Sequence, residues 1–193
     1  TSSNSSAGGA CTGLGIPPTK IDRVLGVVKA YTTRVGEGPF PTELFDKDGV
    51  QLGSVGHEFG ATTGRPRRCG WFDAVVARYA IQLNGIDALI LTKIDVLDEF
   101  KTIKVCIGYK FEGKVYSDMP ADPKIVKNCD PVYTEHEGWM EKTAGIRDFD
   151  KLPEKARNYV KHLSDLLETP FLIISTGPDR EETIQFGPLF KDS

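Results

Sequence analysis

The sequence predicts an α/β fold: part of a largely parallel sheet with flanking helices and an appended β-hairpin. Two uninterrupted apolar runs, Ala88–Thr92 and Phe171–Ile174, are typical of strands buried on both faces, as in parallel sheets. Amphipathic stretches alternate with these runs, which is the order expected of an α/β protein. The 193 residues are enough to bury a core, and they show neither an internal repeat nor a clear domain boundary.

Three stretches are predicted to be amphipathic helices. In Pro17–Tyr31 the apolar residues fall at i, i+3, i+4 and i+7, and two prolines stand where a helix can begin. The second helix starts near Phe72 and ends at Asn84-Gly85, residues that accept left-handed backbone angles. The third helix covers Pro153–Glu168 and leads directly into the second apolar run.

The remaining chain is expected to hold a hairpin and irregular segments. Lys101–Tyr116 alternates between apolar and polar residues around a Glu112-Gly113 turn, which indicates a β-hairpin. Residues 117–151 are polar and interrupted by prolines, and we expect no regular element there. The first nine residues are rich in Ser and Gly and lack Met, which indicates either a linker or the interior of a longer protein.

Composition argues against several classes of partner. A formal net charge of -3 gives no basic surface for nucleic acid, and no apolar run approaches the ~20 residues that cross a membrane. The four cysteines are widely spaced without a CxxC pair, so we expect neither a zinc site nor a disulfide framework but reduced thiols in a cytoplasmic protein. The three scattered histidines are expected to be structural or solvent-facing.

A carboxylate follows the first apolar run, in the segment Leu91–Asp95. Ligands of open α/β sheets bind outside the carboxyl ends of the strands. Asp95 at such a position can accept two parallel hydrogen bonds from guanine, and a site of this kind discriminates by roughly 10⁴–10⁵ against a ligand that cannot complete the pairing. The stem of Lys93 can cover the base while its ammonium stays hydrated. The alternative is a polar cap on a strand end.

The second apolar run ends in Ser175-Thr176-Gly177-Pro178. Gly177 would let the backbone approach a planar base, and Ser175 offers a donor or an acceptor. The alternative is an ordinary turn, because Gly-Pro is a common turn dipeptide. Two strand ends with complementary polar groups are stronger evidence together than either is alone.

The third candidate is the segment Gly60–Gly70, which carries three arginines in four positions. Such arginines repel one another unless an anion relieves the repulsion, and guanidinium groups bind carboxylate and phosphate in a planar fork. Flanking glycines favour a mobile loop that closes on an anionic ligand. The alternative is a solvated basic turn. The chain has no glycine-rich loop of the kind that cradles a triphosphate, so a nucleotide site here would lack its phosphate grip.

Taken with their order and spacing, these motifs resemble those of the adenylosuccinate synthetases across nearly the whole chain, from Thr1 to about Phe190. The segments that carry the resemblance are Thr1–Gly9, Thr33–Leu44, Glu58–Arg65, Arg68–Trp71, Leu91–Asp98 and Ser175–Arg180. Members of this family are more than twice as long. The resemblance therefore implies the C-terminal portion of a P-loop-NTPase-like synthetase fold, whose substrate loop is 58–71 and whose guanine-recognition strands are 87–98 and 170–180.

The resemblance implies a reaction in which GTP phosphorylates the 6-oxygen of IMP and L-aspartate displaces that phosphate. It also implies Mg²⁺ and a cytoplasmic homodimer, with the metal ligands and the catalytic residues in the N-terminal half. The residues that match the family's IMP contacts are Thr1, Val35 and Arg65. Those that match the aspartate loop are Ala61, Thr62, Thr63, Gly64, Arg65, Pro66 and Arg67. Those that match the GTP contacts are Arg67, Lys93, Ile94, Asp95, Ser175, Thr176 and Gly177.

One residue differs from the family's pattern, and two alternative roles for the chain stay open. Pro66 falls where some relatives carry another basic residue, and we expect it to stiffen the loop without changing its role. The chain could instead be a guanine-nucleotide binding module without catalysis, or a structural half that docks onto an N-terminal partner. Such a binding module would leave the arginine loop without a ligand.

Overall fold

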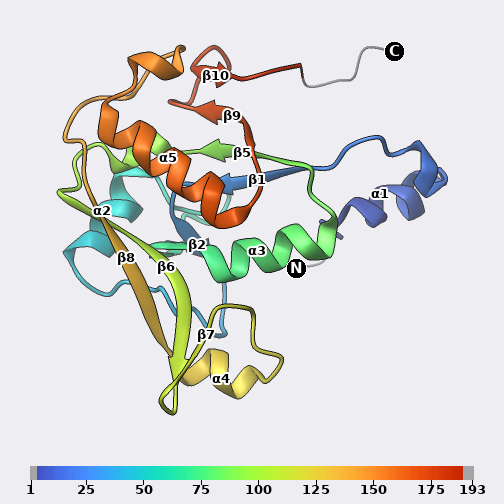
Figure 1. Cartoon of the computed structure of the whole chain (residues 1–193), viewed down its shortest axis with the longest axis horizontal. Helices are drawn as coiled ribbons and strands as arrows, with labels where there is room; N and C mark the ends of the chain where they lie inside the picture. Colours follow the sequence, from blue (N-terminus) through green and yellow to red (C-terminus); the bar gives the residue numbers. More distant parts are fainter. Residues whose placement is uncertain (1–3, 189–193) are drawn as a thin grey trace.

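The computed structural model describes residues 4–188 and has a mixed α/β architecture (Figure 1). Its central sheet has the strand order β1-β5-β9-β10, in which β1, β5 and β9 are parallel and β10 is antiparallel to β9. The predicted fold class, a largely parallel sheet with flanking helices, is confirmed. The strands of this sheet are β1 (Leu25–Lys29), β5 (Ala88–Thr92), β9 (Phe171–Ser175) and β10 (Thr183–Gln185).

Two helices beside this sheet follow their predicted boundaries closely. Helix α5 (Glu154–Leu167) crosses the sheet in Figure 1 and buries its apolar stripe, and the hydroxyl of Tyr159 donates to the carbonyl of Ala30 at 2.9 Å. Helix α3 (Ala74–Asn84) starts at Asp73, whose carboxylate accepts hydrogen bonds from two backbone N–H groups of the first turn. Gly85 ends α3 with a left-handed φ of 59°. Because α5 connects directly to β9, which pairs in parallel with β5, the carboxyl ends of β5 and β9 become neighbours.

The predicted hairpin is part of a second sheet. Strand β6 (Thr102–Phe111) turns at Glu112-Gly113, both with positive φ, and returns as β7 (Lys114–Tyr116). Strand β8 (Asp130–Glu137) pairs antiparallel with β6, and the short β4 (Phe72–Asp73) runs parallel to it. In Figure 1 the strands β6, β7 and β8 extend downward from the central sheet.

The helix predicted over Pro17–Tyr31 is wrong. That segment contains a short 3₁₀ turn, η1 (Pro18–Lys20), and then strand β1, which pairs in parallel with β5. The helical spacing of its apolar residues is coincidental, because Gly26 is required where β1 meets the chain before β5. A Cβ at Gly26 would lie 2.6 Å from Cδ1 of Ile86. The strand is at an edge of the sheet among the described residues, and its Val27 is 68% exposed.

The prediction that residues 117–151 contain no regular element is also partly wrong. This segment contains β8 and the helix α4 (Pro123–Asn128), which begins with a proline after the capping carboxylate of Asp122. Strand β8 was missed because none of its residues is fully buried, so its sequence is largely polar. The remaining elements were not predicted: α1 (Ala7–Leu14), β2 (Thr32–Arg34), α2 (Lys47–Val55), β3 (Arg68–Gly70), η2 (Ile94–Leu97) and η3 (Phe149–Lys151).

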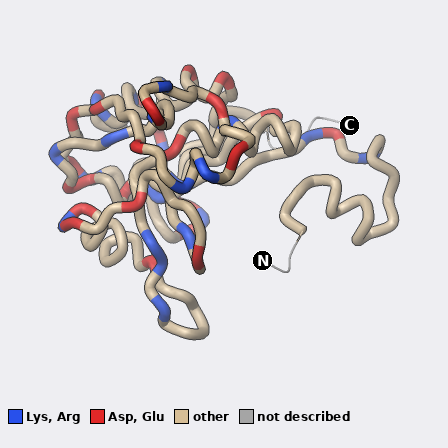
Figure 2. Tube along the Cα trace, turned by 90° about the horizontal axis from the view of Figure 1, so that it is seen from below, with Lys and Arg blue, Asp and Glu red and all other residues tan. Residues whose placement is uncertain are grey.

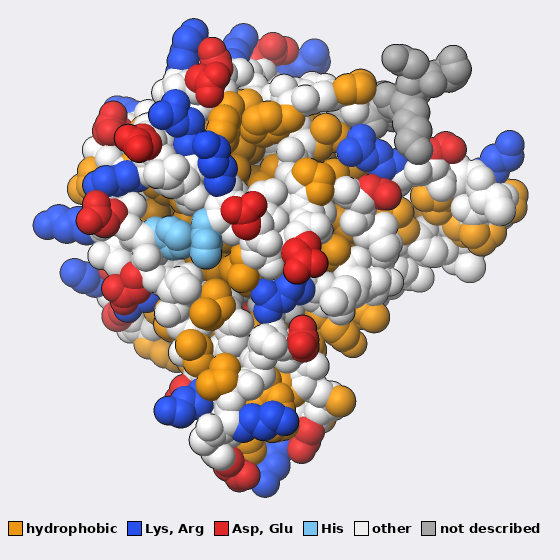
Figure 3. All heavy atoms as spheres, viewed as in Figure 1, with side chains coloured by type: hydrophobic (Ala, Val, Ile, Leu, Met, Phe, Trp, Pro, Cys, Tyr) orange, Lys and Arg blue, Asp and Glu red, His pale blue; other side chains and the backbone are white. Residues whose placement is uncertain are grey.

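The surface carries both signs of charge. Figure 2 shows acidic and basic residues interspersed over the folded body, whereas the segment around α1 carries none. Figure 3 shows histidine side chains among charged groups on the face that carries α5. The rings of His136 and His162 are both partly buried, with centroids 4.6 Å apart, while His57 is exposed. All four cysteines are described and are free thiols. Between residues 4 and 188, no helix has the length and apolarity needed to cross a membrane.

Candidate functional site

The two predicted strand ends meet at one cavity. Because β5 and β9 are parallel neighbours, their carboxyl ends lie at the same edge of the sheet. A cavity of about 250 Å³ at this edge is lined by Lys93, Asp95, Ser175 and Gly177. The structure therefore brings together four of the residues that the sequence indicated for a base. The side chains of Ile94 and Thr176, from the same two motifs, are buried beneath the surface.

Asp95 is half-buried and takes part in no ion pair among the described residues. Burial raises the pKa of its carboxyl above the ordinary value, although the hydrogen bond from its own N–H group opposes this. The charges of Asp98 and Glu182, which raise the pKa, and of Lys93, which lowers it, have smaller effects. A carboxylate in this state gains from donors that a ligand supplies.

Asp98, three residues further on, is structural. Its carboxylate accepts hydrogen bonds from Nε1 of Trp139 at 2.7 Å and from the backbone N–H and the hydroxyl of Thr143, each at 2.8 Å. These bonds tie η2 to the segment after β8 and so fix the turn on which Asp95 stands. Two acids of one motif therefore have different tasks, and only Asp95 lines the cavity.

Lys93 adopts a left-handed conformation with φ of 65°, and its Nζ donates to the carbonyl of Gly56 at 2.8 Å. The ammonium is thus bound to the backbone, where the sequence suggested hydration. This bond anchors the aliphatic stem at the cavity. It also connects the motif after β5 to the end of α2. This region supplies three residues that were not predicted for this cavity or its rim: Val55, the last residue of α2, and Gly56 and His57 after it.

The turn after β9 is fixed by its own hydrogen bonds. The hydroxyl of Ser175 donates to the carbonyl of Gly177 at 2.9 Å, so in this arrangement it offers a ligand a lone pair. The hydroxyl of Thr176 donates to the carbonyl of Ile146 at 2.9 Å. A side chain at Gly177 would collide with the carboxylate of Glu182, which is a reason for glycine in addition to the predicted approach of a base.

Two backbone hydrogen bonds close the base of the predicted substrate loop, and we call this base the loop neck. The backbone N–H of Arg67 donates to the carbonyl of Glu58 at 2.8 Å, and the N–H of Gly60 donates to the carbonyl of Arg65 at 2.9 Å. Between these bonds, residues 61–66 are exposed. The tip therefore places Thr62, Thr63 and Arg65 in solvent, and the hydroxyl of Thr63 accepts a hydrogen bond from the backbone N–H of Arg65 at 3.3 Å.

The three arginines differ, contrary to the expectation that an anionic ligand relieves their repulsion. Arg67 pairs with the buried Glu58 at 2.7 Å, and Arg68 pairs with Glu43. Arg68 also donates to the carbonyls of Gly36 and Gly38, each at 3.0 Å, and so serves the structure. Within residues 4–188 Arg65 has no ion pair. Acidic residues neutralise two of the three, and one of these partners, Glu43, is distant in sequence, which a local pattern could not show.

Of the predicted IMP residues, Val35 is 71% exposed and precedes the segment that Arg68 ties to the base of the loop. Thr1 lies outside the described residues. Arg65 is exposed at the tip of the loop. The structure thus brings Val35 near the loop base through Arg68, whereas it does not join Val35 and Arg65 in one cavity.

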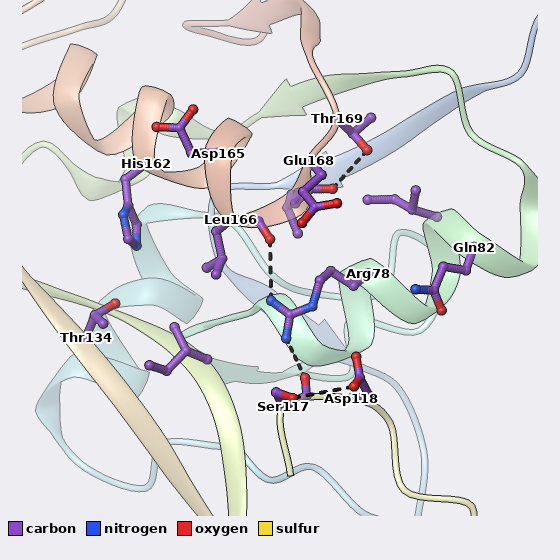
Figure 4. A pocket seen from close by; sticks show the side chains of 13 residues that line it. Arg78, Gln82, Ser117, Asp118, Thr134, His162, Asp165, Leu166, Glu168 and Thr169 are labelled. Atoms are coloured by element: carbon purple, nitrogen blue, oxygen red, sulfur yellow. Dashed lines mark hydrogen bonds between the residues drawn. The ribbon is translucent and has the colours of Figure 1, made fainter. Parts of the chain in front are cut away.

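A larger cavity, of about 730 Å³, lies between α3, α5 and the chain after β7 (Figure 4). None of the predicted site residues lines it. Arg78 crosses it and donates to the backbone carbonyls of Leu166 and Ser117, so backbone oxygens of the protein occupy its donors. The remaining charged groups at its rim include Asp118, Asp165 and Glu168. We therefore place the candidate site at the smaller cavity, where the predicted residues gather and the carboxylate of Asp95 has no ion pair among the described residues.

The described residues do not fit a metal site. Between residues 4 and 188 no group of three or more His, Cys, Asp or Glu side chains is placed to hold an ion. The arrangement at the smaller cavity can bind a flat base through hydrogen bonds, and the neighbouring loop neck adds positive charge for an anionic group.

Comparison with known proteins gives consistent matches. The adenylosuccinate synthetase family model matches residues 1–184. The adenylosuccinate synthetase of Geobacter sulfurreducens is 57% identical over 192 residues, covering 100% of this chain and 44% of that protein. That of Heliobacterium modesticaldum is 54% identical over 98% of this chain and 44% of that protein. The solved structure of a fully ligated adenylosuccinate synthetase from Plasmodium falciparum is similar, with a TM-score of 0.92 and 41% identity over 97% of this chain and 45% of that chain.

The chain thus spans less than half the length of the relatives that it matches. These shares do not confirm the prediction that the matched part is the C-terminal portion.

Proposed function

Since the chain belongs to the adenylosuccinate synthetase family, we propose that it supplies the guanine pocket and the substrate loop of an enzyme that uses GTP to join IMP and L-aspartate. The observation that carries the proposal is the shared cavity of Lys93, Asp95, Ser175 and Gly177, in which the carboxylate lacks an ion pair. Identities of 54–57% to relatives named for this ligase support it.

In the proposed reaction the γ-phosphoryl group of GTP passes to the 6-oxygen of IMP, and GDP leaves. The amine of aspartate then attacks carbon 6 and displaces phosphate, which gives adenylosuccinate. Three ligands with negative charges must be held together, so positive charge near the base pocket is needed. Arg67 is paired at the loop neck with Glu58, the residue after the cavity-lining His57, and Arg65 is exposed at the tip.

Guanine recognition would use Asp95 as the acceptor for the ring N–H and the exocyclic amine. The stem of Lys93, anchored at Gly56, would cover one face of the base, and the turn from Ser175 to Gly177 would close the pocket. Adenine presents the opposite hydrogen-bond pattern on that edge and would leave the buried carboxylate without donors. The pocket would therefore select GTP over ATP.

The other parts of the enzyme complete this proposal. Mg²⁺, which the family implies, supplies charge neutralisation on the phosphates when it is bound, and its ligands would come from residues outside this chain. The loop 61–66 would close on aspartate, with Thr62 and Thr63 donating to its carboxylates, and Val35 and Arg65 would contact IMP. The complete enzyme would act as a homodimer in the cytoplasm.

The test compares this chain with the complete enzyme in an assay of IMP consumption that depends on both GTP and aspartate. We expect turnover by the complete enzyme and none by this chain alone, because the chain lacks a phosphate-binding loop. Turnover by the isolated chain would show that the essential catalytic groups lie within it. GTP binding by the complete enzyme without any effect of aspartate would favour a regulatory binding module.

A further inference from the structure

Glu58 is a fully buried carboxylate at the start of the substrate loop, and it binds three side chains. Its Oε1 accepts hydrogen bonds from Nζ of Lys29 at 2.7 Å and from the hydroxyl of Tyr31 at 2.5 Å. Its Oε2 accepts from Nη1 of Arg67 at 2.7 Å. The side chain of Glu58 has no exposed area, whereas those of Lys29 and Arg67 are 27% and 33% exposed. The carboxylate of Glu58 is therefore in the protein interior, whereas the cationic side chains of Lys29 and Arg67 both reach the surface.

The charges around Glu58 do not cancel. Burial by itself would raise the pKa of Glu58, but the hydrogen bonds from Lys29, Tyr31 and Arg67 outweigh burial and lower it below the ordinary value. The group is therefore ionised at neutral pH. One negative charge faces two positive charges, so the cluster carries an excess of one positive charge at the surface. Such an excess attracts an anion.

The position of the cluster connects the loop to the base cavity. Glu58 follows His57, which lines the cavity, and Lys29 is the register partner of Thr92, which lines it too. Arg67 is also held by its backbone N–H, which donates to the carbonyl of Glu58. Both ends of the loop are therefore fixed beside the cavity, although the tip is exposed.

The guanidinium of Arg67 has N–H donors that make no hydrogen bond among the described residues. Among the described residues, only Nη1 makes a hydrogen bond, to Glu58, while Nε and Nη2 make none. A guanidinium has five N–H donors in a rigid plane, so one edge can hold a carboxylate while another binds a second anion. Arg67 can thus contact a ligand without leaving Glu58.

We propose that Glu58 is a positioning residue whose buried carboxylate holds Arg67 at the rim of the guanine cavity, with free N–H groups directed to the anionic part of the nucleotide. The inference rests on the proposed function, since it deepens the role of the same site. Glu58 does not touch the substrate in this proposal. It fixes the orientation of the residue that does.

The experiment is steady-state kinetics of the complete enzyme with the variant Glu58→Gln. An amide can still accept from Lys29 or Tyr31, but it cannot hold Arg67 by charge. We expect KM for GTP to rise on the order of tenfold, the size of a lost charge-assisted contact, while kcat stays within about threefold. The matched control is Tyr31→Phe, which removes a buried hydrogen bond from the same carboxylate and leaves the pair with Arg67 intact. It should lower the melting temperature and leave KM for GTP within about twofold.

Equal KM values for GTP in the two variants would overturn the proposal, because Glu58 would then act only through stability. If Glu58→Gln does not fold, Glu58→Asp takes its place: it keeps the charge but is one methylene shorter. Its KM for GTP should rise several-fold, and an unchanged KM would overturn the proposal. The unsubstituted complete enzyme serves as a separate reference, because its failure to consume IMP with GTP would refute the proposed function itself.

Discussion

The strand-end cavity and the loop neck each contain one decisive carboxylate, and the two are held in opposite ways. Asp95 lines the cavity without an ion pair, and burial raises its pKa. Glu58 is more deeply buried, yet two cations and a tyrosine hydroxyl lower its pKa. Burial alone therefore does not distinguish a binding residue from a positioning residue. What distinguishes them is whether the protein itself supplies the donors.

The difference also separates stability from function. An ionised carboxylate that lacks donors costs the folded protein free energy, which a ligand can return on binding. A carboxylate with all its partners stabilises the fold, and its removal leaves its partners unpaired. Substitutions that remove the charge at Asp95 and at Glu58 should therefore have opposite effects on stability.

The largest expected effect is on nucleotide preference. Asp95→Asn in the complete enzyme replaces one acceptor oxygen by a donor, which suits xanthine better than guanine. We expect the ratio of kcat/KM for GTP to that for xanthosine triphosphate to fall by roughly a thousandfold. Kinetics with both nucleotides checks this, with Glu135→Gln, in an exposed ion pair with Lys104, as the control. An unchanged ratio would show that Asp95 does not recognise the base, and Asp95 and Glu58 would then not differ as a binding and a positioning residue.

The next effect is on stability at the loop neck. Glu58→Gln should lower the free energy of unfolding by about 3 kcal/mol at neutral pH, because two cations lose their buried partner. A carboxylate with a lowered folded-state pKa stabilises above its unfolded pKa, and this contribution is lost as pH falls through the folded pKa. The difference between the variant and the unsubstituted protein should therefore shrink in acid. Urea unfolding at pH 7 and near pH 3 measures it, and a constant difference would contradict the ionic explanation.

The smallest effect has the opposite sign. Asp95→Asn should raise the free energy of unfolding of the ligand-free protein by about 0.5 kcal/mol at pH 7, since it removes a desolvated charge. A carboxyl with a raised folded-state pKa stabilises most below its unfolded pKa, and that contribution is lost as pH rises through the folded pKa. The advantage of Asn should thus exist at neutral pH and vanish in acid. A loss of stability at pH 7 would show that Asp95 has protein partners after all.

The sequence predicted those parts of the fold that depend on local pattern. The buried runs of β5 and β9 and the stripe of α5 contain enough apolar residues to determine their structure. Strand β1 was misassigned because four apolar residues fit a helical period, whereas the tertiary contact of Gly26 with Ile86 decides the outcome. Strand β8 was not predicted because its residues are exposed or only partly buried, so its sequence shows no clear alternation of apolar and polar residues.

The candidate site was predictable to the same extent. Asp95 and Ser175 follow apolar strands, so the rule that ligands bind at strand ends was sufficient to place them together. The roles of Glu58 and Arg68 depend on partners more than twenty residues away, namely Lys29 and Glu43. No local pattern contains those pairs. Only the folded chain separates the arginine that supports the structure from those that remain for a ligand.

The outer edge of β1 has a practical consequence for work with this chain. Among residues 4–188, β5 alone pairs with β1, and the exposed Val27 lies on the strand whose other edge has no partner. Open strand edges invite pairing with other chains. Concentrated preparations of the isolated chain should therefore precipitate or form mixed oligomers, and a lysine in place of Val27 would be a simple remedy for sample handling.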